Sequence, residues 1–154
     1  MSAGNPYFAA QDRIRALIAG APYFVTPPLA PGQIITEIPA DLQYWTDQNL
    51  QALDFGVTIE TAKGESDVSS YAALQERAEF VVSIVHNPQN DPAHNVLDAL
   101  WAIVSAVHGQ PVMYPPRSAP TDFDFFRVLG HLKVGTSDTK SVHELRIAAG
   151  LRLF

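Results

Sequence analysis

Residues 135–141 (GTSDTKS) combine hydroxyl, carboxylate and amine groups that could bind a phosphate or supply a nucleophile. A phosphate-binding loop needs its second glycine where this chain has Thr139, and it needs a helix after it, whereas a strand-like segment follows here. A serine hydrolase needs a nucleophile in a sharp turn, and the sequence has no Gly-x-Ser-x-Gly segment. We therefore predict that 135–141 is a polar hairpin loop.

Two of the five histidines, His131 and His143, lie symmetrically about Ser137 and could face each other across that hairpin. Opposed imidazoles can bind a metal ion, but no third ligand is evident, and histidines in strands are usually ordinary half-buried residues. The sequence therefore predicts neither a metal site nor a cofactor at the hairpin.

Another group of polar residues, His86, Asp91 and His94, brackets a transition from strand to helix. Helix capping explains Asp91, and the spacing matches no metal-binding motif. Asp122 and Asp124 could perform acid–base chemistry, but they lie in a polar connection without an apolar pocket that would raise a carboxyl pKa. We expect none of these residues to be catalytic or to bind a cofactor, and we expect that the protein is not an enzyme.

Length and composition favour one domain, residues 1–154, with a sizeable core. The absence of cysteine excludes disulfides and thiolate sites and suits a reducing compartment. A net charge of -6 with only ten Lys and Arg argues against specific nucleic-acid binding. The apolar runs are far shorter than the roughly 20 residues that cross a bilayer, so we expect neither a membrane partner nor export.

The first half of the chain predicts one helix and an irregular arm. Asn5 can cap a helix over 6–19, Pro6 suits its first position, and Gly20 can end it. Five of the twelve prolines lie between Pro22 and Pro39, which predicts a proline-rich arm at about 22–55. A weak helical pattern within this arm runs from Asp41 to Leu53, and its candidate apolar anchors are Leu42, Trp45, Leu50 and Leu53.

The second half predicts a sheet and a second helix. Residues 57–60 alternate like a strand, 63–66 resemble a turn, and 80–86 are apolar on both faces, which is typical of a central strand. A helix should start at Pro92, capped by Asn90 or Asp91, and end at Gly109. Its expected core stripe is Val96, Leu97, Leu100, Ile103, Val104 and Val107, with a second face of Ala99, Ala102 and Ala106.

The last third of the sequence predicts an exposed loop at about 110–122 and two closing strands, 125–134 and 142–154. In the final strand the odd-numbered residues from His143 should face the core. Together the elements predict an α+β fold. Its mixed or mostly antiparallel sheet of about four to five strands is packed by two main helices and carries the proline-rich arm.

The order of LIAG, FVVSIVH, NVLDALWAIVSAVH and HELRIAAGLRLF resembles that of tail terminator, or tail completion, proteins of tailed bacteriophages and prophages. Those proteins are small α+β proteins that form rings, commonly six-fold, on the tail tube. The resemblance implies a virion protein of the tail or neck, assembled in the host cytoplasm, that stops tube polymerisation. Its implied partners are copies of itself in a homo-oligomeric ring, the tail tube protein and the head–tail connector, and DNA would pass through the ring without specific binding.

Exposed aromatic, sulfur-containing and guanidinium side chains are typical of interface anchors. The candidates for contacts with other subunits or partners are Tyr44, Trp45, Met113, Tyr114 and Arg117. Trp45 and Tyr114 could equally pack over the ends of the sheet. Two further classes stay open: a small-molecule-binding or regulatory α+β domain, and a small enzyme whose site the sequence does not reveal.

Overall fold

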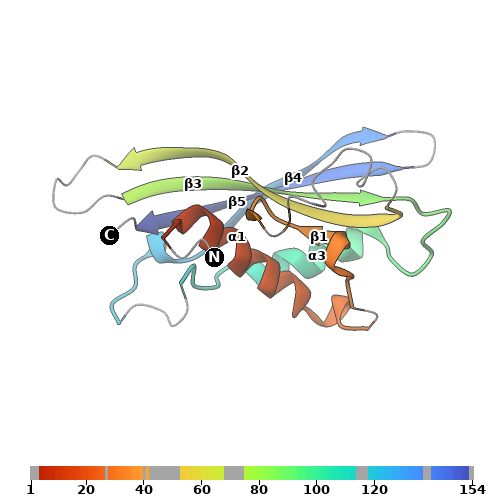
Figure 1. The fold of residues 1–154 in the computed structure, drawn as a ribbon, viewed down its shortest axis with the longest axis horizontal. Helices are drawn as coiled ribbons and strands as arrows, with labels where there is room; N and C mark the ends of the chain where they lie inside the picture. Colours follow the sequence, from red (N-terminus) through yellow and green to blue (C-terminus); the bar gives the residue numbers. More distant parts are fainter. Residues whose placement is uncertain are drawn as a thin grey trace.

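The protein forms one five-stranded sheet with helices on one of its faces (Figure 1). The computed structural model describes residues 4–26, 28–39, 41, 53–67, 75–113, 118–136 and 140–152. The elements are α1 (Pro6–Ala19), η1 (Pro22–Phe24), η2 (Pro31–Gln33), β1 (Ile34–Ile35), β2 (Phe55–Asp67), β3 (Gln75–His86), α3 (Val96–Val107), η4 (Asp122–Asp124), β4 (Arg127–Thr136) and β5 (Ser141–Arg152). The predicted α+β fold is confirmed.

The strand order is β1-β2-β3-β5-β4, and only β1 pairs in parallel with its neighbour. The predicted central strand, β3, lies in the middle of this order. Phe80, Val82 and Ile84 are fully buried on the face beneath which the helices pack, and Val81 on the other face is 8% exposed. An apolar residue on each face suits a strand with neighbours on both sides.

The predicted turn at 63–66 is wrong, because β2 runs straight through it. Gly64 pairs with Ala78 and Asp67 with Gln75, so these residues extend the β2–β3 ladder beyond a register shift between Thr61 and Lys63. Lys, Gly, Glu and Ser are common turn residues, but here the partner strand supplies hydrogen bonds that a short turn would have lost. The connection from β2 to β3 lies outside the described residues.

The first helix, α1, occupies the predicted residues. The Asn5 side chain accepts hydrogen bonds from the backbone amides of Tyr7 and Phe8, Pro6 starts the helix, and Gly20 follows its last residue. The local caps therefore set both ends of this helix.

The second helix, α3, begins later than predicted. Asn95 is the cap, accepting from the amides of Leu97 and Asp98, and Val96 is the first helical residue. The start at Pro92 is wrong because the Asp91 carboxylate is bound by His94 instead of capping a helix. At the other end Gly109, with φ of +79°, ends the helix as predicted.

The core stripe of α3 is rotated relative to the prediction. Leu100, Ile103 and Val107 are buried as expected, but Ala99, which was assigned to the second face, is buried with them. Leu97 is 62% exposed, so its assignment to the core is wrong. A short helix lying on a sheet buries only the side chains directed at the strands, and Leu97 lies on the flank.

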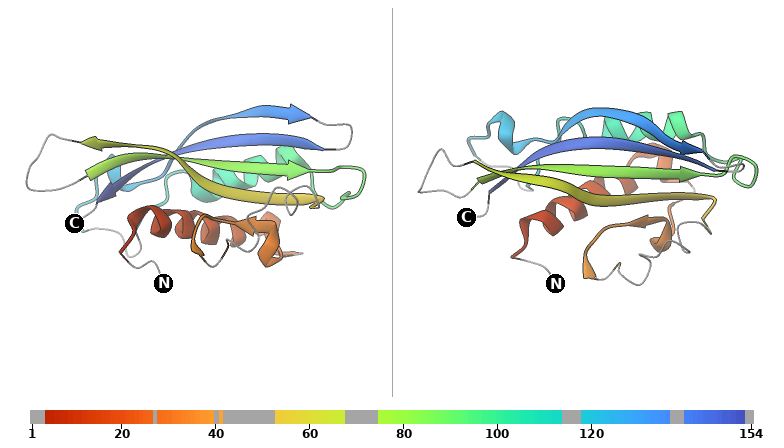
Figure 2. Two further views of the ribbon diagram at one scale, coloured as in Figure 1. Left: turned by 45° about the horizontal axis from the view of Figure 1, so that its top comes forward. Right: turned by 90° about the horizontal axis from the view of Figure 1, so that it is seen from above.

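One face of the sheet is covered by α1, α3 and the segment that contains β1, and the opposite face carries no α-helix in the described part of the chain (Figure 2). We call the opposite face the open face. As predicted for β5, His143, Leu145, Ile147, Ala149 and Leu151 are buried on the covered face. Arg146, Ala148 and Gly150 alternate with them on the open face.

Candidate interaction site

The residues predicted as interface anchors are mostly outside the described part. Tyr44, Trp45, Tyr114 and Arg117 belong to this group. Met113 is described, and its side chain is 57% exposed beside the buried Val112. The predicted helix over 41–53 also lies outside the described residues, apart from Asp41 and Leu53.

The large exposed apolar side chains of the described residues lie mostly on two elements. Five of the seven in the described part of the chain lie on α3 and β4, and we call them the β4–α3 surface: Leu97, Trp101, Leu129, Leu132 and Val134. Trp101 is 71% exposed and Leu132 64%. The two elements are neighbours, because the Val128 amide donates to His108 Nδ1 at 3.0 Å directly after α3 (Figure 2).

Strand β4 has a strand partner on one side only within the described residues. It pairs with β5 through a ladder that shifts register between Val128 and Gly130 and again between Lys133 and Gly135. Bulges of this kind are one way in which edge strands avoid uncontrolled pairing. Among the described residues this edge therefore has no second strand partner, and its ladder is irregular.

Only a partial signal for this surface is present in the sequence. Residues 128–134 contain apolar side chains of both parities, which is also typical of a central strand. Only the strand order shows that this apolar strand lies at an edge and leaves part of its surface uncovered.

A buried polar network holds part of the other edge of the sheet. Gln11, which is 1% exposed, donates from Nε2 to Glu37 Oε1 and Thr61 Oγ1, both at 2.9 Å. Glu37 Oε1 also accepts from the Thr61 amide at 2.6 Å, and Gln11 Oε1 accepts from the Glu37 amide at 2.8 Å. These bonds join α1, the segment after β1, and β2.

A buried carboxylate fixes the same segment a second time. Asp41 is 7% exposed, and its Oδ2 accepts from the Thr36 amide at 2.7 Å and the Thr36 hydroxyl at 2.9 Å. Arg15 of α1 donates to the same oxygen at 2.6 Å. The end of the proline-rich segment is therefore held onto α1 by groups that are 26 positions apart in the sequence.

His86, Asp91 and His94 form neither a metal site nor a helix cap in the described part of the chain. His94 and His86 both approach Asp91 Oδ2, at 2.7 and 3.4 Å, and the His94 ring stacks on Phe55 with centroids 4.1 Å apart. The view of Asp91 as a helix cap is therefore wrong. The three side chains anchor the connection from β3 to α3, and among the described residues no group of three potential ligands has an arrangement that could hold a metal ion.

The expected opposition of His131 and His143 is also wrong. His131 lies opposite Leu145 and His143 opposite Lys133, because the register shifts in β4 move the strands out of symmetry about Ser137. His143 is 7% exposed, and its Nδ1 has no hydrogen-bond partner in the described part of the chain. Burial, with Lys133 and His131 nearby, lowers the pKa of His143.

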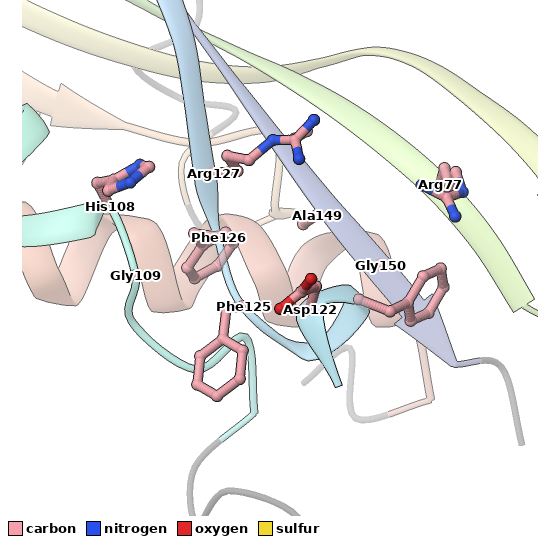
Figure 3. Close-up of a pocket in the computed structure, with 11 residues that line it drawn as sticks. Arg77, His108, Gly109, Asp122, Phe125, Phe126, Arg127, Ala149 and Gly150 are labelled. Carbon is pink, nitrogen blue, oxygen red and sulfur yellow. The ribbon is translucent and has the colours of Figure 1, made fainter. Parts of the chain in front are cut away.

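A cavity of about 640 Å³ opens where η4 meets β5 (Figure 3). Arg77 and Arg127 flank it, and its further lining includes Asp122, His108 and several aromatic rings. Neither arginine was singled out by the sequence, because a guanidinium in a strand gives no signal until its neighbours are known.

In the described residues no helix is long and apolar enough to cross a membrane.

Comparison with known proteins does not identify a family for this chain. No protein family model and no curated protein matches the sequence. A solved structure titled "Virion of native gene transfer agent (GTA) particle" contains a chain that is similar over 63% of this chain and 69% of its own length, with a TM-score of 0.44 and 13% identity. A likeness at this level establishes no shared function.

Proposed function

We propose that this protein is a structural virion protein of the tail terminator type. It assembles with copies of itself into a ring, of six subunits by analogy with the family it resembles, that caps the tail tube and joins it to the head connector. The proposal includes location in the tail or neck and the absence of enzymatic activity. The observation that carries it is the β4–α3 surface.

Large exposed apolar surfaces on a folded chain mark contacts with other proteins. A closed ring is built from heterologous contacts, in which one surface of a subunit meets a different surface of the next. The two edges of this sheet differ as such a contact requires: the β1–β2 edge is closed within the chain, and β4 carries Leu129, Leu132 and Val134 in the open. Two identical edges would favour symmetric dimers instead.

The decisive experiment measures assembly and capping separately. Sedimentation velocity over a wide concentration range should show a discrete multimer, and electron microscopy should show the protein at one end of purified tail tubes, which then stop growing. A monomer that neither associates at any concentration nor binds tubes would refute the proposal.

A second candidate, a small-molecule-binding domain, is favoured by the cavity beside η4. Its volume falls within the range of ligand sites, roughly 300–1,000 Å³. Retention of a stoichiometric small molecule through purification, detected by native mass spectrometry, would favour this candidate over the virion role.

A further inference from the structure

The cavity beside η4 lies on the open face, where the chain crosses over the end of β5. The Phe123 ring rests directly on Gly150, and a Cβ at Gly150 would collide with both the ring and the Phe123 carbonyl. Only glycine allows this close approach. The floor of the cavity is therefore formed by the smallest side chains of β5, at Ala148 and Gly150.

The chain itself places an aromatic ring and a carboxylate on this floor. Phe123 lies 5.1 Å from the Arg152 guanidinium and 5.8 Å from that of Arg77. Asp124 accepts two hydrogen bonds from Arg152, at 2.9 and 3.3 Å. Cation–π contact and a bidentate carboxylate pair thus hold the Asp-Phe-Asp turn of η4 in place.

Two guanidinium groups at the cavity are left for another ligand. Arg127 on β4 lies opposite Ala148, and Arg77 on β3 lies opposite Gly150, so both project on the open face from the two strands that flank β5. In the described part of the chain neither has an ion pair, and the Arg77 guanidinium lies over the Phe123 ring, 5.8 Å from its centroid. Figure 3 shows them on either side of the cavity.

The other charges around the cavity leave a small positive excess. Arg146 pairs with Glu79 at 2.9 Å, and Arg152 pairs with Asp124. His108 accepts a hydrogen bond at Nδ1 from a backbone amide, so this nitrogen carries no proton. Asp122 is the acidic residue in the lining. Within the lining two arginines therefore face one carboxylate, and Glu65, which lies opposite Arg77 on β2, is outside the lining and pairs with Lys63.

We propose that this cavity binds an acidic, aromatic segment of a partner protein. A carboxylate of the partner sits between Arg77 and Arg127, and an apolar ring of the partner packs against Phe125 on the cavity wall. On the adjacent floor the chain's own Asp-Phe-Asp turn makes contacts of the same two kinds: an aromatic ring lies over a guanidinium, and a carboxylate accepts hydrogen bonds from one. A nucleic-acid backbone fits less well, since it requires many unpaired cations in a row. This site does not depend on ring formation.

The test uses the full chain and a fluorescent peptide with the sequence of residues 120–126, PTDFDFF. Anisotropy should show saturable binding, and a PTNFNFF peptide should bind about tenfold more weakly, the loss expected for one charge-assisted contact. Arg127→Glu should weaken binding of the acidic peptide at least as much. Lys133→Glu, which makes the same charge change on β4 outside the cavity, should leave it unchanged.

Asp122→Asn provides an effect of opposite sign. Removal of the like charge should tighten binding of the acidic peptide about threefold or more, whereas a purely structural role of Asp122 would leave affinity unchanged. Circular dichroism of each variant checks that the fold is retained.

Three results would overturn the proposal: equal binding of the two peptides, acidic-peptide binding that is insensitive to Arg127→Glu, or binding of a short DNA duplex through the same arginines with no binding of the peptide. Each of these leaves the ring proposal intact, because assembly is read by sedimentation. Conversely, if the protein is a monomer that binds the acidic peptide, the cavity proposal stands and the ring proposal fails.

Discussion

The two edges of the sheet differ in their contacts with the rest of the chain. At the β1–β2 edge, Gln11 and Asp41 organise buried hydrogen bonds that fasten the segment after β1 to α1 and β2. At the β4 edge, Leu132 and Val134 are 64% and 45% exposed, and the described residues place no further strand beside it. Within the described residues, one edge is held by contacts of the chain itself, and the proposed function assigns the other edge to a neighbouring molecule.

This difference bears on how a small sheet can be stable as a subunit and still avoid indiscriminate strand pairing. Unpaired edge groups invite contact with any other strand, so a protein with two bare edges would risk aggregation. Here the polar network closes one side, and bulges interrupt the other. Under the proposed function, assembly uses the β4–α3 surface, and hydrogen bonds within the subunit hold the segment at the opposite edge.

Removal of Asp41 should cause the largest effect. Asp41→Ala leaves the Thr36 amide and hydroxyl and the Arg15 guanidinium without their buried acceptor, which should lower the free energy of unfolding by about 3 kcal/mol. Urea denaturation should show a lower midpoint at an unchanged slope.

Asp12→Ala is the matched control for this variant, since Asp12 also pairs with Arg15 but its side chain is 59% exposed. It should cost no more than about 1 kcal/mol. Equal losses for the two variants would show that the buried network does not secure this edge.

A charge at the bare edge should impair association and leave the subunit folded. Leu132→Lys should weaken self-association about tenfold or more, or 1.4 kcal/mol, because it places an ammonium group in the proposed contact. The unfolding free energy should change by no more than about 0.5 kcal/mol, as at other exposed sites. Sedimentation and urea titration measure the two quantities.

Val25→Lys is the comparison variant on a different element, because Val25 is 54% exposed and follows η1. We expect its self-association to match that of the unaltered protein. If Val25→Lys disrupts assembly and Leu132→Lys does not, the contact lies at η1 and not at β4.

Acidification should weaken the sheet beside β4. The pKa of His143 is lowered by burial and by the charges of Lys133 and His131, so the folded state binds a proton less readily than the unfolded state does. The contribution of neutral His143 is present above its ordinary value of 6.5 and is lost as the pH falls through the lowered folded pKa.

His143→Leu should therefore reduce the loss of stability on acidification, by up to about 1 kcal/mol. Thermal melts across this pH range provide the measurement. Parallel curves for the two proteins would exclude His143 as the source of the acid sensitivity.

The smallest effect is expected near the closed edge, at Glu60 of β2. Burial, followed by the neighbouring carboxylates of Glu37 and Glu144, raises the pKa of Glu60, so its contribution is present below the ordinary value of 4.5 and is lost as the pH rises through the raised folded pKa. Glu60→Gln should be more stable than the parent at neutral pH by about 0.5 kcal/mol, and the difference should shrink on acidification. Chemical denaturation at two pH values tests this sign.

Local sequence signals located most of the elements and failed where distant residues intervened. The caps Asn5 and Gly20 bounded α1 correctly, since a cap acts within one turn of its helix. Asp91 looked equally suitable as a cap, but its carboxylate contacts the rings of His94 and His86 instead. Residues 63–66 looked like a turn, but β3 provides a pairing partner for them.

The sequence by itself determined the class of fold, the central place of β3 and the two faces of β5, because periodicity and caps depend on neighbours along the chain. The tertiary structure decided which edge the chain's own hydrogen bonds hold and where Arg77 and Arg127 come together. Gln11 and Thr61 are 50 positions apart, and Arg77 and Arg127 flank one cavity from strands that are not adjacent. Such pairings follow from strand order and register, which no local pattern encodes.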